Sequence, residues 1–408
     1  MIADKFKYIC VDCKKEYPHA FNTFCEKCKG LIDVEYNLSN AAINQDSNPF
    51  LRYFDLLPIL DKNNLICLDN KKTPCIRAHT LGKLLCSDNI YLKDETKNPT
   101  GTTKDRMASI VLSSFKELGI TKFVASSTGN SSVSLATIIN KHPFSTLYIV
   151  IGSEFADRLD FEITQNIKLI LLEGATFDEA STEAGKFAKA KGIVNEAGFF
   201  NPARREGLKI TFMEACDQME RSPDWYFQAV SSAMGVYGVY KAAKQYYEIG
   251  RISRIPQFCC IQQDTCCPMV KAWEEDSRII EIRHIFKNPS GLAKAILRGN
   301  PEQTYPYIYD IVKECGGTFV MVSQKEIREA QELVMETEKI AICATSACTI
   351  AALKKMLENG TVTRDEVVLV NLTGMEKNNT GLHKSISNIE PIRESEWRSE
   401  NFWLEYNL

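Results

Sequence analysis

A repeat of short apolar strands, turns and helices between residues 122 and 191 limits the fold of this 408-residue chain more than any other feature. The first repeat has a strand-like stretch at Lys122–Ala125, the turn S126-S-T-G-N-S-S-V-S134 and a helical pattern to Asn140. Further strand-like runs are Ser145–Gly152 and Ile167–Glu173, and helix-like segments are Asp157–Gln165 and Phe177–Lys191. This alternation predicts α/β domains with open parallel sheets, whose functional loops lie at the carboxyl ends of the strands.

A second informative segment is K93-D-E-T-K-N-P-T-G-T-T-K-D-R106, in which a Gly/Thr-rich turn leads to Lys104. Apolar residues follow at helical spacing, namely Met107, Ile110, Val111, Phe115 and Leu118, and Gly119 fits the helix end. Lys104 is therefore expected in the first helical turn. There the helix dipole and any burial lower the pKa of its amine, as an amine nucleophile toward an aldehyde requires. The alternative for this segment alone is an ordinary solvated lysine.

The composition sets wider bounds on domains, partners and compartment. With 44% hydrophobic and 25% charged residues, the chain can bury large cores, and two domains plus an appendage are expected. A net charge of −3 and the absence of an apolar run of about 20 residues predict neither nucleic-acid nor membrane partners. The N-terminus lacks the apolar core of a signal peptide, so the cytoplasm is the expected compartment. The fifteen cysteines favour a reducing one.

Four of the cysteines have the spacing of a metal site. Cys10, Cys13, Cys25 and Cys28 form C-x2-C-x11-C-x2-C, in which each pair can present two thiolates to one tetrahedral Zn²⁺. A closed shell of four sulfurs predicts a structural ion, and the alternative is four reduced thiols. The residues up to Tyr36 alternate like a strand leaving a zinc ribbon, and a polar linker follows.

The Lys104 segment resembles the active-site segment of threonine synthases and their relatives among fold type II pyridoxal 5′-phosphate (PLP) enzymes. These typically read K-D-E-x-x-N-P-T-G-S-F-K-D-R. The resemblance implies that Lys104 is the catalytic residue and forms a Schiff base with PLP. Thr102 and Thr103 stand where relatives have Ser-Phe, which removes an aromatic side chain from the pocket wall. Some threonine synthases and cysteate synthases also begin with similar cysteine pairs.

The turn after residue 125 is similar to the S-x-G-N-T/S segment of the same family. The resemblance implies that Asn130 contacts the 3′-oxygen of PLP. It implies substrate contacts from the turn and from N201-P-A-R-R-E-G-L-K209, which is similar to N-P-x-x-x-E-G-x-K, and the residues concerned are Ser127, Thr128, Gly129, Ser131 and Lys209. Arg204 and Arg205 are interpreted as solvated charges at a helix start, with anion contacts as the alternative.

Two later segments complete the resemblance. V230-S-S-A-M-G-V-Y-G-V-Y-K241 occupies the place of a glycine-rich phosphate loop, so PLP contacts are expected from Ser231, Ser232, Ala233, Met234 and Gly235. N371-L-T-G374 follows a predicted strand at Glu366–Val370, and Thr373 matches the residue whose hydroxyl meets the pyridine nitrogen. Cys343-Ala344 replaces Glu-Pro in the family's E-P-A-S-A motif.

Together these matches imply a fold type II PLP enzyme, similar to the tryptophan synthase β subunit, with two open parallel-sheet domains and a zinc ribbon. The predicted ribbon is 1–37, with 38–90 as linker and start of the large domain. Residues 91–215 are predicted to form the smaller α/β domain with Lys104 and Asn130, and 216–408 the larger one with the phosphate loop and Thr373. A homodimer is expected, because relatives are often dimers.

The implied activity is elimination and replacement on a small, O-phosphorylated amino acid, most like threonine synthase, which uses O-phosphohomoserine and water. An alternative is a β-replacement enzyme similar to cysteate synthase, which uses O-phosphoserine and sulfite. Two alternatives of other classes are a non-catalytic binding protein on the same fold and a zinc-ribbon nucleic-acid binder. The acidic charge balance disfavours the second.

Overall fold

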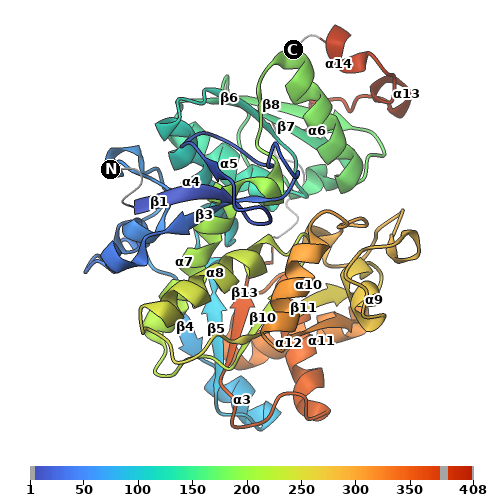
Figure 1. Cartoon of the computed structure of the whole chain (residues 1–408). Helices are drawn as coiled ribbons and strands as arrows, with labels where there is room; N and C mark the ends of the chain where they lie inside the picture. Colours follow the sequence, from blue (N-terminus) through green and yellow to red (C-terminus); the bar gives the residue numbers. More distant parts are fainter. Residues whose placement is uncertain (1–4, 377–384, 407–408) are drawn as a thin grey trace. The chain divides into compact units, whose positions relative to one another are not determined.

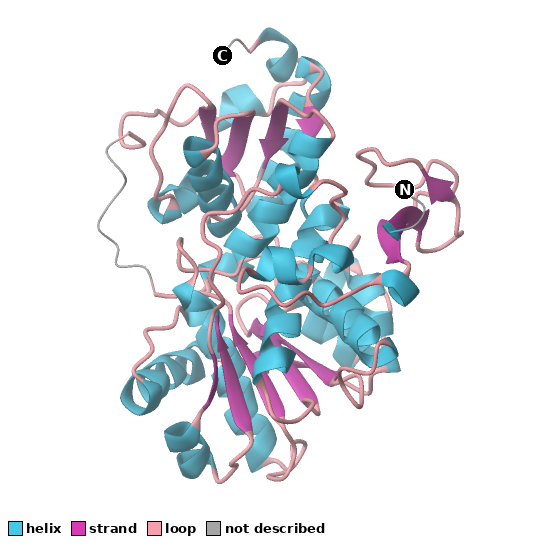
Figure 2. Cartoon of the chain, turned by 90° about the vertical axis from the view of Figure 1, so that its left-hand side faces the viewer, coloured by secondary structure: helices cyan, strands magenta, loops and turns pink. Residues whose placement is uncertain are grey.

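The computed structural model describes residues 5–376 and 385–406, which form two compact units interleaved along the chain (Figure 1). The first unit comprises Met1–Lys71, Lys104–Gly207 and Asn379–Leu408, and the second comprises Lys72–Thr103 and Leu208–Asn378. The domain boundaries expected from the sequence stay a prediction. Both units contain parallel sheets with helices, as the strand and helix alternation predicts (Figure 2).

The first unit is built on a four-stranded parallel sheet of order β8-β7-β6-β9. Its strands are β6 (Lys122–Ala125), β7 (Thr146–Gly152), β8 (Ile167–Leu172) and β9 (Val194–Asn195). Its longer helices are α4 (Lys104–Glu117), α5 (Asn130–Lys141) and α6 (Phe177–Lys191), and its short ones are α2 (Pro49–Arg52), α13 (Glu394–Trp397) and α14 (Phe402–Glu405). The predicted strands and the predicted helices at 104, 130 and 177 are therefore confirmed.

The apolar stripe predicted after Lys104 forms part of this unit's core. Met107, Ile110, Val111 and Phe115 of α4 are all fully buried. The ring of Phe115 meets that of Phe123 on β6 edge-on, with 4.9 Å between centroids. Burial of such side chains at about 1.5–3 kcal/mol each holds α4, and with it Lys104, in place.

One predicted helix, Asp157–Gln165, is wrong. The chain there leaves a 3₁₀ turn at Ser153–Arg158 and continues as an irregular segment. Leu159 and Phe161 are both buried, at 2% and 5% exposure. Residues two apart point to the same side of an extended segment but to different faces of a helix, so the burial of both side chains favours an extended segment.

In the first unit, a small antiparallel sheet of order β2-β1-β3 holds Cys10 at the end of β1, and Cys13, Cys25 and Cys28 lie in the loops between its strands. Its strands are β1 (Phe6–Cys10), β2 (Glu16–Tyr17) and β3 (Ile32–Tyr36), the last being the strand predicted at the end of the ribbon. Phe6, Tyr8, Val34 and Tyr36 belong to its own apolar cluster.

The second unit has a six-stranded sheet of order β12-β11-β10-β13-β5-β4, parallel except for β4. Its strands are β4 (Cys75–Arg77), β5 (Ile90–Asp94), β10 (Trp225–Ala229), β11 (Gln257–Gln263), β12 (Thr318–Val322) and β13 (Val368–Leu372). Its helices are α3 (His79–Leu85), α8 (Met234–Glu248), α9 (Pro268–Glu274), α10 (Tyr305–Glu314), α11 (Gln324–Glu338) and α12 (Ala344–Glu358). Helix α7 (Pro202–Gln218) contributes residues to both units.

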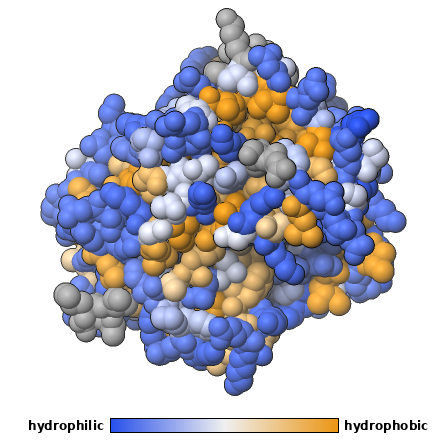
Figure 3. All heavy atoms as spheres, turned by 90° about the horizontal axis from the view of Figure 1, so that it is seen from above, coloured by the Kyte–Doolittle hydropathy of each residue, from blue (hydrophilic) through white to orange (hydrophobic). Residues whose placement is uncertain are grey.

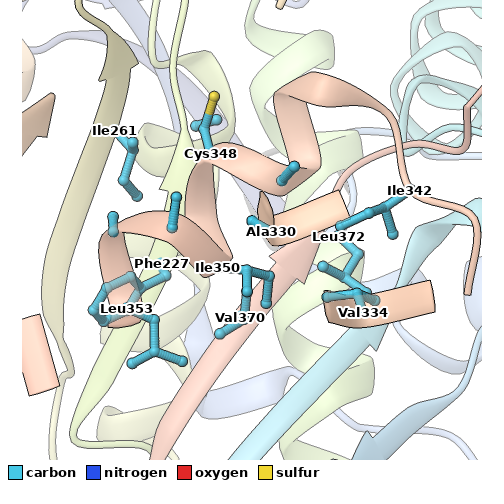
Figure 4. Packing of buried hydrophobic residues seen from close by; sticks show 14 of the residues in the cluster. Phe227, Ile261, Ala330, Val334, Ile342, Cys348, Ile350, Leu353, Val370 and Leu372 are labelled. Atoms are coloured by element: carbon cyan, nitrogen blue, oxygen red, sulfur yellow. The ribbon is translucent and has the colours of Figure 1, made fainter. Parts of the chain in front are cut away.

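Helix α12 packs against the middle of this sheet. Ile350 and Leu353 of α12 lie against Phe227 of β10 and Val370 of β13, and all four side chains are fully buried (Figure 4). Strand β13 is buried along its whole length, which suits its sequence V-L-V-N-L, in which Asn371 is the one polar residue.

None of the helices formed by residues 5–376 and 385–406 has the length and apolar character that a membrane span needs. The surface in Figure 3 shows hydrophilic side chains around smaller groups of hydrophobic ones.

A glycine allows the close approach of α7 to α4 within the first unit. A Cβ at Gly207 would lie 2.7 Å from the carbonyl oxygen of Arg106 and 2.8 Å from Cα of Met107. These are backbone atoms of α4, so they cannot move aside as a side chain does.

We therefore predict that Gly207→Ala lowers the free energy of unfolding by about 1–3 kcal/mol, because the added methyl group forces the two helices apart. Gly185 of α6 is the matched control. A Cβ there would meet the Asn195 side chain at 3.4 Å, so Gly185→Ala should stabilise by about 0.5–1 kcal/mol through helix propensity. Urea unfolding of both variants measures this, and equal effects would contradict the packing argument.

Candidate active site

Lys104 is the first residue of α4 and its side chain is half-buried. Burial of the ammonium, followed by the positive charge of Arg204, lowers its pKa from the ordinary value to about 8. The sequence predicted this direction from burial and the helix start. A lysine with this pKa has much more free amine near neutral pH than an ordinary lysine, and the free amine is the form that attacks a carbonyl carbon.

The two arginines after Pro202 are buried, so the interpretation as solvated charges is wrong. Arg204 is 3% exposed and binds both carboxylate oxygens of Glu196, with 2.5 Å between Nε and Oε1. Its Nη1 also donates to the Ser131 hydroxyl at 3.3 Å. Arg205 is fully buried and donates to the carbonyl oxygens of Phe199 and Ile32. Both guanidinium groups therefore have protein acceptors, which buried charges need.

The turn before α5 is held by one serine hydroxyl. Oγ of Ser127 accepts hydrogen bonds from the main-chain N–H groups of Gly129 and Ser132, at 3.0 and 3.2 Å, and lies 2.7 Å from Oγ of Ser132. Gly129 has φ 124°, a conformation that favours glycine. Ser127 thus shapes the turn through its side chain, and its predicted substrate contact stays a prediction.

Arg158 orients the residue that follows this turn. Its guanidinium donates to the carbonyl oxygen of Thr128 and to Oδ1 of Asn130, the second at 3.5 Å. With Oδ1 directed toward Arg158, the amide of Asn130 presents Nδ2 as its donor group. This orientation suits the predicted contact with an oxygen acceptor. No motif in the sequence singles out Arg158.

In the second unit, the segment before α8 has the form of an anion-binding helix start. Ser231 and Ser232 are half-buried, and Ala233 has φ 56°, a left-handed conformation that is rare for alanine. Helix α8 then begins at Met234 and runs for 15 residues, so its first N–H groups lack partners within the helix. A Cβ at Gly235 would lie 2.2 Å from the side-chain Nε2 of Gln228, so any other residue there would force that side chain to shift.

Thr373 follows β13 and is half-buried. Its carbonyl oxygen accepts a 2.9 Å hydrogen bond from the N–H of Thr103, and Thr102 forms an antiparallel bridge with Gly374. The hydroxyl of Ser346 bonds both the N–H and the carbonyl oxygen of Gly374, at 3.0 and 2.9 Å. The loop that ends at residue 103 and the turn at Thr373 are therefore joined within the second unit.

Lys209, predicted as a substrate contact, is fully buried in the second unit, where its Nζ donates to Oε1 of Gln245 at 3.0 Å. Lys104, Asn130 and the Ser127–Ser131 turn belong to the first unit, and Ser231–Gly235, Thr373 and Lys209 belong to the second. Their roles stay predictions.

The four cysteines predicted to bind a metal lie together. Their sulfur atoms are all within 4.8 Å of one another, with 3.4 Å between Cys10 and Cys28 and 3.5 Å between Cys13 and Cys25. Four thiol ligands at such distances could hold one metal ion.

Comparisons with known proteins agree with these features. The family model described as "Pyridoxal-phosphate dependent enzyme" matches residues 66–374. The chain is 31% identical to a threonine synthase of Methanocaldococcus jannaschii, over 90% of this chain and 91% of that protein. It is 27% identical to a cysteate synthase of Methanosarcina barkeri, over 95% and 96%. Among solved structures, processed threonine deaminase isoform 2 from Solanum lycopersicum has a TM-score of 0.64 at 18% identity, covering 86% of this chain and 96% of that one. This last likeness concerns the fold.

We predict that amine-selective labelling of Lys104 rises with pH through a midpoint of about 8, since the unprotonated amine reacts. An ordinary exposed lysine should respond near pH 10.4. Peptide mass spectrometry of protein labelled briefly between pH 6 and 11 measures both. A Lys104 midpoint above pH 10 would contradict the effect of burial.

Proposed function

Because the chain belongs to the family of pyridoxal-phosphate dependent enzymes, we propose that it performs elimination and replacement on an O-phosphorylated amino acid. The main reaction proposed is that of threonine synthase, which converts O-phosphohomoserine and water to threonine and phosphate. The observation that carries the proposal is the position of Lys104, which lies half-buried at the start of α4, matches the family's cofactor lysine and has a pKa lowered by burial. The similarity to a threonine synthase along 90% of the chain supports it.

The described residues suit PLP. The Lys104 amine is a carbonyl nucleophile near neutral pH, and the start of α8, with the hydroxyls of Ser231 and Ser232, suits a phosphate group. The unusual left-handed Ala233 keeps the turn that a glycine would otherwise make. The glycine-poor sequence of this loop is therefore compatible with phosphate binding.

When bound, PLP withdraws electrons from the α-carbon of an amino-acid substrate and so makes its hydrogen acidic. Lys104 would bind the aldehyde carbon of the cofactor and move the proton at the substrate α-carbon. Asn130, oriented by Arg158, would donate to the cofactor's 3′-oxygen. The neutral hydroxyl of Thr373 would meet the ring nitrogen, and main-chain N–H groups of the 127–131 turn would bind the substrate carboxylate.

A second candidate is β-replacement on O-phosphoserine, as in cysteate synthase. Differences from the threonine synthase pattern favour it, because they fall on proposed site segments: Thr103 replaces an aromatic residue and Cys343-Ala344 replaces Glu-Pro. A non-catalytic binding protein on the same fold would not require a lysine of lowered pKa at position 104.

Three further features belong to the proposal. The four cysteines bind one structural Zn²⁺, because four thiolates form a closed tetrahedral shell. The protein is a homodimer, which sedimentation equilibrium can measure. Its compartment is the cytoplasm, where a reducing environment suits fifteen cysteines.

We predict that the protein with added PLP shows an absorption band near about 410–420 nm that Lys104→Ala abolishes. Lys116→Ala, an exposed lysine of the same helix, should leave the band unchanged. Borohydride reduction should fix PLP on the peptide that contains Lys104. No band in the wild-type protein, or an equal band in Lys104→Ala, would refute the proposed function.

The same preparation distinguishes the two substrates. O-Phosphohomoserine should release phosphate and yield threonine, whereas phosphate release from O-phosphoserine with sulfite would establish the second candidate. Phosphate release from neither compound, despite the band, would exclude both reactions.

We predict about one Zn²⁺ per chain in protein purified without chelator. Cys28→Ser should lose the ion and lower the melting temperature, since structural zinc contributes directly to folding free energy. Cys86→Ser changes another exposed cysteine, which lies outside the cluster. This variant should keep the zinc ion and the melting temperature of the wild-type protein. Elemental analysis and thermal unfolding measure this, and a wild-type protein free of zinc would contradict the assignment.

A further inference from the structure

Thr103, the residue before Lys104, is fixed through its main chain. It is 4% exposed, and its N–H donates to the carbonyl oxygen of Thr373 at 2.9 Å. On the preceding side, the N–H of Met375 donates to the carbonyl oxygen of Gly101, also at 2.9 Å. A short antiparallel contact thus holds the end of the loop, and Lys104 begins its helix one residue later.

The side chain of Thr103 starts a chain of hydroxyl groups. Its Oγ1 lies 3.2 Å from Oγ1 of Thr211, and the Thr211 hydroxyl donates to Oε2 of Glu95 at 3.4 Å. A threonine hydroxyl has one proton, so Thr211 accepts from Thr103 when it donates to Glu95. The hydrogen bonds therefore run in one direction, from Thr103 to the carboxylate.

Glu95 is a rigid end point for this chain. It is fully buried, and its two oxygens accept from the Thr73 hydroxyl at 2.6 Å and from Nδ2 of Asn98 at 2.9 Å. Thr73 is in turn held by a buried ion pair, because its carbonyl oxygen accepts from Lys93 and its N–H donates to Glu214. Nζ of Lys93 lies 2.6 Å from Oε2 of Glu214. Movement of Glu95 would break several buried hydrogen bonds at once.

We propose that Thr103 is a positioning residue for Lys104. Buried hydrogen bonds that run from Thr103 through Thr211 and Glu95 to Thr73 hold it in place. This inference rests on the proposed function. Thr103 itself is not a ligand, because it is buried and its hydroxyl is engaged by Thr211. The aromatic residue that relatives have at position 103 has no hydroxyl, so the Thr103–Thr211 pair is this chain's own means of fixing the peptide bond before the lysine.

The test compares Thr103→Val and Thr211→Val with the conservative variant Thr103→Ser and with Thr304→Val. Valine keeps the shape of threonine and removes the hydroxyl. Thr304 is a fully buried threonine of the same unit whose hydroxyl donates to the Pro301 carbonyl, so its loss controls for the general cost of a buried hydroxyl.

In Thr103→Val and in Thr211→Val, we expect PLP still to attach to Lys104. We expect kcat to fall about 10- to 100-fold while KM stays nearly unchanged. The double variant should be no worse than either single one, because both break the same chain. Thr103→Ser should restore kcat, and Thr304→Val should keep it.

A second measurement uses the protein without PLP and separates this inference from the proposed function. The midpoint of Lys104 labelling should move upward from about pH 8 in Thr103→Val and Thr211→Val, because a less fixed lysine loses part of its burial. It should stay in place in Thr304→Val. Unchanged labelling and unchanged kcat would overturn the positioning role. A wild-type protein that binds no PLP would defeat the proposed function, while the labelling shift would still decide the positioning of Lys104.

Discussion

The parallel pairing of β5 with β13 is the constraint on which the second unit depends. Ile90 to Asp94 align with Val368 to Leu372, so two segments that are far apart along the chain are neighbouring strands of one sheet. Closing so long a loop costs conformational entropy, which the buried apolar side chains of both strands offset. Just after both strands end, the chain makes a separate antiparallel contact between residues 101–103 and residues 373–375. This contact holds residues 101–103, the end of the loop, against the turn that follows β13.

The same register explains a row of buried polar side chains at the carboxyl end of this sheet. Lys93 of β5 is paired with Asn371 of β13, whose Nδ2 donates to the Tyr226 hydroxyl and to Oε1 of Gln228 on β10. Gln228 in turn lies against Gly235 at the start of α8. Oδ1 of Asn371 is buried and has no hydrogen-bond partner among the described residues. Burying polar groups costs stability unless they are hydrogen-bonded. These side chains are therefore held in the arrangement that satisfies most of their hydrogen bonds.

The sequence was sufficient for features that depend on local pattern. The strands at 122, 146 and 167, the helix start at Lys104 and the cysteine cluster follow from periodicity and spacing. The pairs Arg204–Glu196 and Lys93–Glu214 were missed, the second because its partners are 121 residues apart and no local pattern links them. Without its partner Glu196, the sequence around Arg204 predicts a solvated charge, whereas the structure buries it. The helix expected at 157–165 failed because buried contacts of Leu159 and Phe161 override the local preference.

Two of three consecutive residues of α7 bind the ribbon, the small sheet β1–β3 with its four cysteines, and so join it to the rest of the first unit. Arg204 binds Glu196 and helps to lower the pKa of Lys104. Arg205 reaches the ribbon at Asp33, 3.2 Å away, and Glu206 accepts a 2.7 Å hydrogen bond from Tyr36 at the ribbon's last strand. Arg205 and Glu206 are fully buried, so loss of the ribbon fold would leave two charged groups without these partners. Such a loss costs several kcal/mol per group, and it would fall on the helical turn that also carries Arg204. A metal ion that stabilises the ribbon would therefore also stabilise the surroundings of the catalytic lysine proposed here.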